Sequence, residues 1–260
     1  MAQFVCRYRK GDEVRWISHL DLKRTLERAM RRAELPLELT EGHNPHPKLS
    51  FGPPLPLGAT GDAELLALRL REATDPADVK ERLNRQLPAG LEIVETWAVP
   101  GHKKKETFGE LDVAEYRITV SGCFQGEEIA ARVRKLLATE ELLVQRGGKR
   151  PEREVDLRPM ILSLDVAAAG ADGIELHARL QTGSHGGARP QEVLDLLGLA
   201  DEEGLVSYRR TGLYASSARP ESSGASTKPA SRASSGEWTP PSPMSASIGT
   251  YSSAPTTWGS

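Results

Sequence analysis

Cysteine is scarce in this chain of 260 residues, which contains only Cys6 and Cys123. The two lie far apart and form no C-x-x-C spacing, which argues against a disulfide framework and against a zinc or iron–sulfur site built from this chain alone. A Walker loop, a dinucleotide glycine fingerprint and a Ser/His/Asp order are also missing. The histidines lack carboxylate partners at a recognisable metal-ligand spacing. We therefore expect neither a metal ion nor a cofactor.

Long hydrophobic runs are absent too. No stretch reaches transmembrane length, and the first residues lack the apolar core of a signal peptide. The formal net charge is −2, so the chain as a whole has no bulk attraction to nucleic acid or to a membrane surface. We expect a cytoplasmic protein without a membrane partner.

Hydrophobic periodicity predicts the elements of the first hundred residues. Residues 3–10 alternate as a strand does, and the turn Gly11-Asp12 would fold them onto a second strand over 14–17. Ser18 and Asp21 have the spacing of a capping box, which opens a helix that ends at Pro36. Further elements follow: strands at 37–40, 64–70 and 91–99, and a helix at 75–87. The main order of strand, helix, strand, strand, helix, strand is the ferredoxin-like pattern.

The same order recurs after a basic linker at residues 101–111. We expect strands at 114–121, within 142–146 and 154–166, at 173–182 and at 205–214, with helices at 127–138 and 190–197. The predicted fold class is therefore α+β, with two tandem ferredoxin-like (βαββαβ) modules at residues 1–100 and 112–214. In that topology both helices of a module cover one sheet face, and the other face is free for a partner.

Residues 215–260 differ from the rest in composition. This segment contains fourteen serines and only five charged residues, and it shows no helical or strand periodicity. Such a segment buries too little apolar surface to offset the entropy of ordering it. We expect a disordered Ser-rich tail.

Residues 41–58 form a ribbon that ordinary packing explains poorly, with five prolines, three glycines and two histidines in eighteen residues. The prolines exclude a helix and hold the chain extended. His46 lies between Pro45 and Pro47, which fix its direction, as suits an active-site group. Alternatively, these prolines only protect an edge strand from aggregation. The substrate-binding candidates on this ribbon are Asn44, Lys48 and Ser50.

His19 is the second candidate catalytic residue. It stands in the first turn of the predicted helix, where the helix dipole favours a neutral imidazole that can act as a general base or bind a phosphate. The alternative is a packed histidine beside a helix cap.

Arginines form a stripe on the polar face of the same helix. The stripe consists of Arg24, Arg28, Arg31 and Arg32. Further basic clusters stand at Lys103–Lys105 and around Gly147-Gly148. With exposed Tyr8, Trp16 or Phe51 they would follow an RNA backbone and stack its bases; alternatively, they are solvated surface charges. The polar runs at 156–159 and 209–212 predict a buried Asp–Arg pair that holds the two modules together.

These motifs resemble the radical-SAM-linked protein family, an uncharacterised bacterial group found beside or fused to cobalamin-binding radical SAM proteins. The resemblance covers roughly residues 3–214. It is carried by Ile17-Ser18-His19-Leu20-Asp21-Leu22, by Arg28-Ala29-Met30-Arg31-Arg32-Ala33 and by residues 44–58, Asn-Pro-His-Pro through Leu-Gly. Family members usually have an aromatic residue at the position of His43, so the resemblance favours His19 and His46 over His43.

The resemblance implies a radical SAM protein as partner. This chain has too few cysteines for the three-cysteine cluster of such enzymes, so it would present the substrate. Our first hypothesis is an accessory protein that binds RNA, either transfer or ribosomal RNA. Two alternatives stay open: a metal-independent RNA-processing or RNA-modifying enzyme that uses His19 and His46, and a structural adaptor that docks on the radical SAM protein.

Overall fold

The structure is a computed structural model that describes residues 2–99, 108–147, 152–183, 186–200 and 206–216. Within these ranges the chain has four α-helices and a mostly antiparallel sheet, in agreement with the expected α+β class. Most of the predicted linker (101–107) and nearly all of the predicted tail (217–260) lie outside the described residues. We call residues 2–99 the first half and residues 108–216 the second half.

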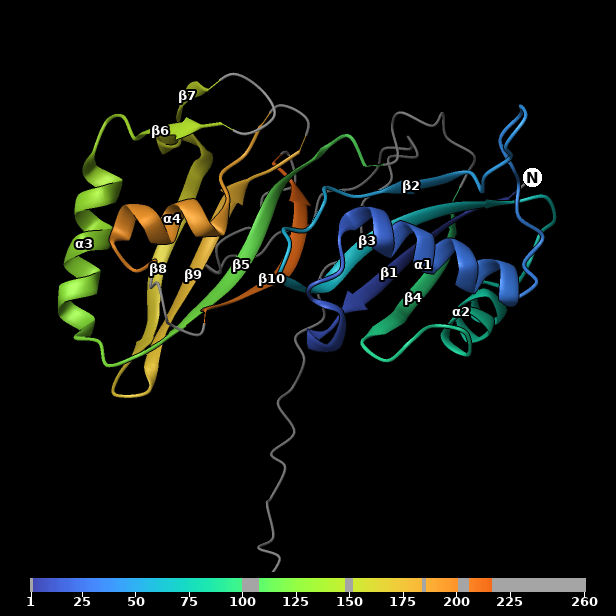
Figure 1. Cartoon of the computed structure of the whole chain (residues 1–260), viewed down its shortest axis with the longest axis horizontal. Coiled ribbons are helices and arrows are strands. Elements are labelled where there is room, and N and C mark those ends of the chain that lie inside the picture. The colour runs from blue at the N-terminus through green and yellow to red at the C-terminus, as the bar shows by residue number, and fades with distance from the viewer. Residues whose placement is uncertain (1, 100–107, 148–151, 184–185, 201–205, 217–260) are drawn as a thin grey trace, which may run out of the picture. The chain divides into compact units, whose positions relative to one another are not determined.

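The first half packs two helices against antiparallel strands. Its elements are β1 (Ala2–Lys10), α1 (His19–Arg32), β2 (Leu49–Phe51), β3 (Thr60–Leu70), α2 (Pro76–Asn84) and β4 (Leu91–Val99). The strand order is β4-β1-β3, and β2 pairs with β3. Leu22, Leu26 and Met30 recur at helical spacing on α1 and are buried against β1 and β3, which fixes the helix on the sheet (Figure 1).

Two strand predictions in this half are wrong. Residues 14–17 do not form a strand, since η1 (Asp12–Val14) is a 3-10 turn. The reason is topological: β1 pairs with β3 on one side and with β4 on the other, so no edge of β1 is free for another strand. Residues 37–40 are reduced to the isolated bridges Leu37↔Leu70 and Leu39↔Pro47.

The second half repeats this order with an added hairpin. Its elements are β5 (Leu111–Ser121), α3 (Gly126–Ala138), β6 (Leu143–Arg146), β7 (Arg153–Asp156), η2 (Arg158–Met160), β8 (Ile161–Ala169), β9 (Gly173–Gln181), α4 (Pro190–Leu197) and β10 (Val206–Ala215). The strand order is β10-β5-β9-β8, and β6 and β7 form a separate pair.

One short parallel pairing joins the halves into a single eight-stranded sheet. Arg209 of β10 is paired with Thr60 of β3, and Arg210 with Gly61. Gly61 has to be small, because a Cβ there would lie 2.5 Å from Oε1 of Glu64. This junction places the side chain of Arg210 beside the carboxylate of Glu64.

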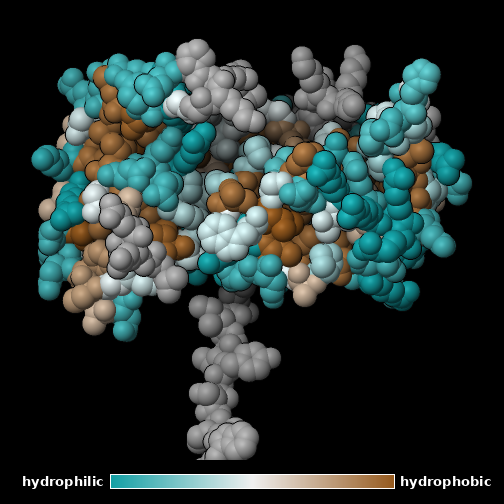
Figure 2. All heavy atoms as spheres, viewed as in Figure 1, coloured by the Kyte–Doolittle hydropathy of each residue, from teal (hydrophilic) through white to brown (hydrophobic). Residues whose placement is uncertain are grey.

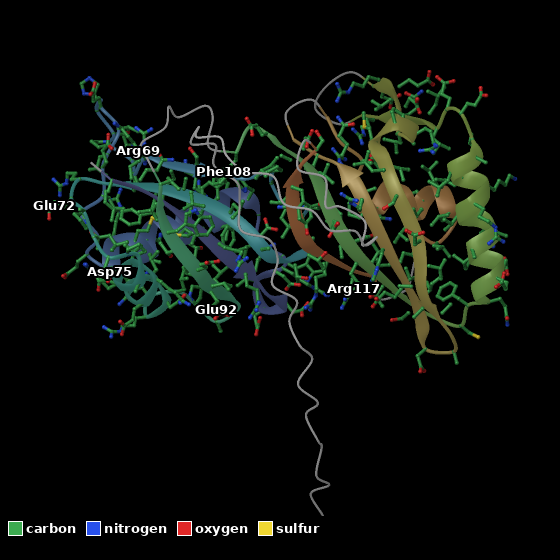
Figure 3. All side chains as sticks on the ribbon, turned by 180° about the vertical axis from the view of Figure 1, so that it is seen from behind. Arg69, Glu72, Asp75, Glu92, Phe108 and Arg117 are labelled. Carbon is green, nitrogen blue, oxygen red and sulfur yellow. The ribbon has the colours of Figure 1, made fainter. Side chains whose placement is uncertain are left out.

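The sheet face opposite α1 is polar and carries paired charges. Arg9 contacts Glu92 at 2.9 Å in the first half, and Arg117 contacts Glu175 at 3.4 Å in the second. Glu92 and Arg117 are both seen on this face in Figure 3, where α1 lies behind the strands. Each of these two arginines therefore has an acidic partner on this face.

Candidate functional site

Ser18 is the N-cap of α1, at the position where the sequence predicts the start of the helix. The Asp21 N–H donates to Oγ of Ser18 at 3.1 Å, and the Ser18 hydroxyl donates to Oδ2 of Asp21 at 2.7 Å. This bond from Ser18, followed by a bond from Arg24, lowers the pKa of the Asp21 carboxyl. The cap fixes where the helix begins and therefore which way His19 points.

His19 lies edge-on against Phe51 of β2, with ring centroids 5.2 Å apart and an interplanar angle of 80°. Burial against its surroundings, and then the positive charge of Lys23, lower the pKa of the imidazole, while Glu64 opposes the shift. A lowered pKa keeps His19 neutral at pH 7, so the ring can donate and accept hydrogen bonds without carrying charge.

Trp16 is the most exposed large hydrophobic residue of the described chain, with 67% of its surface accessible. The Arg15 guanidinium lies 5.0 Å from the ring centroid. The ring also lies close over Gly58, where a Cβ would come within 2.7 Å of it, and Gly58 has φ +80°. Glycine therefore satisfies both the backbone conformation and the contact.

We call Arg15, Trp16, His19 and Phe51 the aromatic platform. Two exposed leucines, Leu20 and Leu57, accompany it. Figure 2 shows hydrophobic side chains gathered near the start of α1, whereas hydrophilic ones cover most of its remaining length. The surface thus combines stacking groups at one end of the helix with charge along the rest.

The four arginines of the stripe differ in their partners. Arg24 contacts Asp21 at 3.2 Å, and Arg32 donates to the backbone oxygen of Gln86 at 2.7 Å. Arg28 and Arg31 are exposed and have no side-chain partner within the described ranges. These two guanidinium groups are therefore available to a ligand without breaking an existing contact.

The candidate residues on the ribbon, Asn44, His46 and Lys48, are not part of the aromatic platform. Asn44 and His46 are exposed on a loop that is closed by the Thr40 N–H donating to the oxygen of His46 at 2.8 Å. The Lys48 ammonium is paired with the carboxylate of Glu38, which is only 7% exposed. Lys48 therefore holds the base of the loop together.

His19 and His46 do not share a site. His19 contacts Phe51, and Phe51 lies five residue steps along an extended stretch from His46, which corresponds to roughly 16 Å. Figure 1 shows the loop that contains His46 near the C-terminal end of α1, whereas His19 stands at the other end. Ser50 points to the opposite sheet face from its neighbour Phe51, because strand side chains alternate.

A buried ion pair joins the halves, but its acid is not the expected aspartate. Arg210, 1% exposed, donates from Nε to Oε1 of Glu64 at 2.8 Å. Asp156 accepts the N–H groups of Leu142 and Arg158 instead, at 2.8 and 2.9 Å. Sequence reasoning missed Glu64, although it has the same strand phase as the buried Leu66, Leu68 and Leu70 and therefore points inward with them.

The other basic clusters contribute less. Arg146 is paired with Glu192 and is largely buried. Lys103–Lys105, Lys149 and Arg150 lie outside the described residues. In the described part of the chain no three His, Cys, Asp or Glu side chains come together as metal ligands would. No helix there is long and apolar enough to cross a membrane.

The comparisons place this mixed α/β chain in a bacterial family. It belongs to the family described as uncharacterized protein conserved in bacteria (DUF2344), which matches residues 3–190. No curated protein matches the sequence.

Among solved structures, the chain is similar to one in a Cbf5-Nop10-Gar1 complex, with 12% identity over 81% of this chain and a TM-score of 0.44. It is also similar to one in an H/ACA RNP bound to a substrate RNA containing 2′-deoxyuridine, with 12% identity, 80% coverage of this chain and the same TM-score. It spans about half of each of those chains, 48% and 47% respectively.

The lowered pKa of His19 predicts a pH dependence of stability. The folded state binds a proton at His19 less readily than the unfolded chain does. The contribution of neutral His19 to the free energy of unfolding is therefore full above about pH 6.5 and is lost as the pH falls below it. Histidine NMR titration should give His19 a pKa below that of a model peptide, and Lys23→Gln should raise it. The free energy of unfolding in urea, taken as wild type minus His19→Gln, should be smaller at pH 5 than at pH 7.5. A pKa at or above the peptide value would contradict this assignment.

Proposed function

We propose that this protein is an accessory module that binds single-stranded RNA through the exposed face of α1 and the aromatic platform. We propose that its scaffold consists of two tandem ferredoxin-like modules, residues 1–100 and 112–214. The strand orders β4-β1-β3-β2 and β10-β5-β9-β8 support this, because each places the strands of one half in the ferredoxin-like sequence 4-1-3-2.

The observation that carries the proposal is the combination of stacking groups at the start of α1 with unpaired positive charge along the same helix. An exposed tryptophan and a neutral histidine offer ring faces and edges to unstacked bases, and arginines offer charge to phosphates. From His19 to Arg31 the helix rises about 18 Å, which matches several nucleotides of an extended strand. Unpaired bases are needed for stacking, so the ligand class is single-stranded RNA or a loop of transfer or ribosomal RNA.

Binding explains the arrangement better than catalysis does. A general acid and a general base have to reach the same reacting group within hydrogen-bond distance. The separation of His19 from His46 gives no support to an RNA-cleaving or base-modifying enzyme that uses both. We place His19 on the base-stacking surface, and we place Asn44 and His46 near the end of the helix that carries Arg28 and Arg31.

RNA binding should depend on salt through Arg28 and Arg31. Each phosphate contact to a single strand contributes about 0.7 to the slope of log affinity against log salt, so the double variant Arg28→Gln/Arg31→Gln should lower the slope by about 1.4. Fluorescence anisotropy with a labelled single-stranded oligoribonucleotide measures this. The matched control is Arg134→Gln/Lys135→Gln on α3, which also removes two exposed charges from a helix and should leave the slope unchanged. Equal slopes for wild type and the α1 variant would rule out this surface.

We further propose a radical SAM protein as the partner to which the RNA is presented, on the basis of the sequence resemblance. Leu20 and Leu57 are 53% and 63% exposed beside the platform and are suited to a protein contact. Co-purification with the radical SAM protein of the same genome should be lost in Leu20→Ser/Leu57→Ser, while RNA affinity stays within about twofold. Leu162→Ser, which changes a similarly exposed leucine on β8, is the control. Failure of the wild-type chain to co-purify would refute the partnership.

A further inference from the structure

The segment 52–59 has more hydrogen-bond acceptors than donors. Pro53, Pro54 and Pro56 each keep a carbonyl but have no N–H. Pro53 and Ala59 are buried, so water does not readily satisfy the carbonyls near them. The segment therefore needs donors from elsewhere in the fold.

Two buried cations supply these donors. Arg210 donates from Nη2 to the oxygen of Pro53 at 2.7 Å and from Nη1 to the oxygen of Pro54 at 3.4 Å. Lys10, 2% exposed, donates to the oxygens of Ala59 at 3.1 Å and of Arg15 at 2.8 Å. Lys10 thereby ties the far end of the segment to the residue that precedes Trp16.

One carboxylate, Glu64, pairs with Arg210 in this cluster. Glu64, 3% exposed, accepts from both Nε and Nη2 of Arg210. Burial alone would lower the pKa of the Arg210 guanidinium, but Glu64 outweighs this and the net pKa is raised. Arg210 is therefore charged at every physiological pH, and its five N–H donors are permanently available.

We propose that Arg210 and Lys10 are positioning residues for the RNA-binding surface, an inference that rests on the proposed function. Lys10 comes from β1 and Arg210 from β10, so the two halves of the chain jointly hold segment 52–59. The Gly58 N–H donates to the oxygen of Arg15 at 3.0 Å, and Trp16 lies over Gly58. Holding this segment therefore holds Trp16 in place, and the second half is required for a surface that belongs to the first.

The test replaces the ion pair while the core stays filled. Apolar residues of similar volume often replace a buried ion pair at little cost, so we use Glu64→Met/Arg210→Met. Hydrogen exchange is then followed at the amides of Gly58 and Ala59, whose bonds to Arg15 and Pro56 depend on the segment, with the buried Val133 of α3 as control. We expect exchange at Gly58 and Ala59 to accelerate at least tenfold while Val133 is unchanged. Unchanged protection at Gly58 and Ala59 would overturn the proposal.

A second variant distinguishes a local effect on segment 52–59 from a general loss of stability. If Val133 also accelerates in the double variant, Arg210→Lys is used, because lysine keeps the charge beside Glu64 but cannot reach the carboxylate and both carbonyls together. Acceleration confined to Gly58 and Ala59 is again the expected result, and equal acceleration at all three amides would overturn the proposal.

RNA affinity separates this proposal from the proposed function. In the variant with the loosened segment, affinity for the single-stranded oligoribonucleotide should fall about tenfold, with no further loss when Trp16→Ala is already present. An undiminished affinity would overturn the positioning role, and a full extra loss in the Trp16→Ala background would show that it does not act through Trp16. If the wild-type chain binds no RNA, the proposed function fails, whereas the exchange experiment still decides whether Arg210 holds the segment.

Discussion

The contact between the Arg210 guanidinium and the Glu64 carboxylate is the interaction on which the rest of this structure depends. Within the described residues the only strand pairing between the two halves is the short parallel one of β3 with β10, and this ion pair stands at that pairing. An unpartnered charge at this depth would be strongly destabilising, so each side chain requires the other. The pair therefore specifies how β10 meets β3 at this junction.

The same contact links the interior to the surface. Other N–H groups of the same guanidinium donate to the carbonyls of Pro53 and Pro54, which belong to the segment that lies beneath Trp16. Proline gives the segment stiffness at the cost of donors, and buried cations restore the donors. A rigid segment loses little entropy when a ligand binds, which suits a stacking platform.

Local chemistry made much of the fold predictable from the sequence. The helix over 190–197 and the N-cap at Ser18 follow from short-range rules and are present as predicted. The failed strand at 14–17 depended on long-range pairing, because only the topology shows that both edges of β1 are taken. Lys10 continues the inward alternation of Phe4, Cys6 and Tyr8, a signal that was available and pointed to a buried cation.

The candidate site was less predictable than the fold. The sequence brought His19 and His46 together in one hypothesis because both lie near prolines or a helix start, but spacing along the chain says nothing of the direction in which the ribbon runs. Glu64 is in phase with the buried Leu66, Leu68 and Leu70, so its inward direction could be predicted, but its partner Arg210 in the second half could not. Partners that are 146 residues apart are found only in three dimensions.

A double-mutant cycle on Glu64 and Arg210 tests the central claim most directly. Urea unfolding of Glu64→Met, of Arg210→Met and of the double variant gives three free energies to compare with wild type. Each single change should cost about 3–5 kcal/mol, because it leaves a buried charge without a partner, and the double variant should be more stable than either single one. A double variant that loses the sum of the two single costs would show that the residues act independently and would contradict the account.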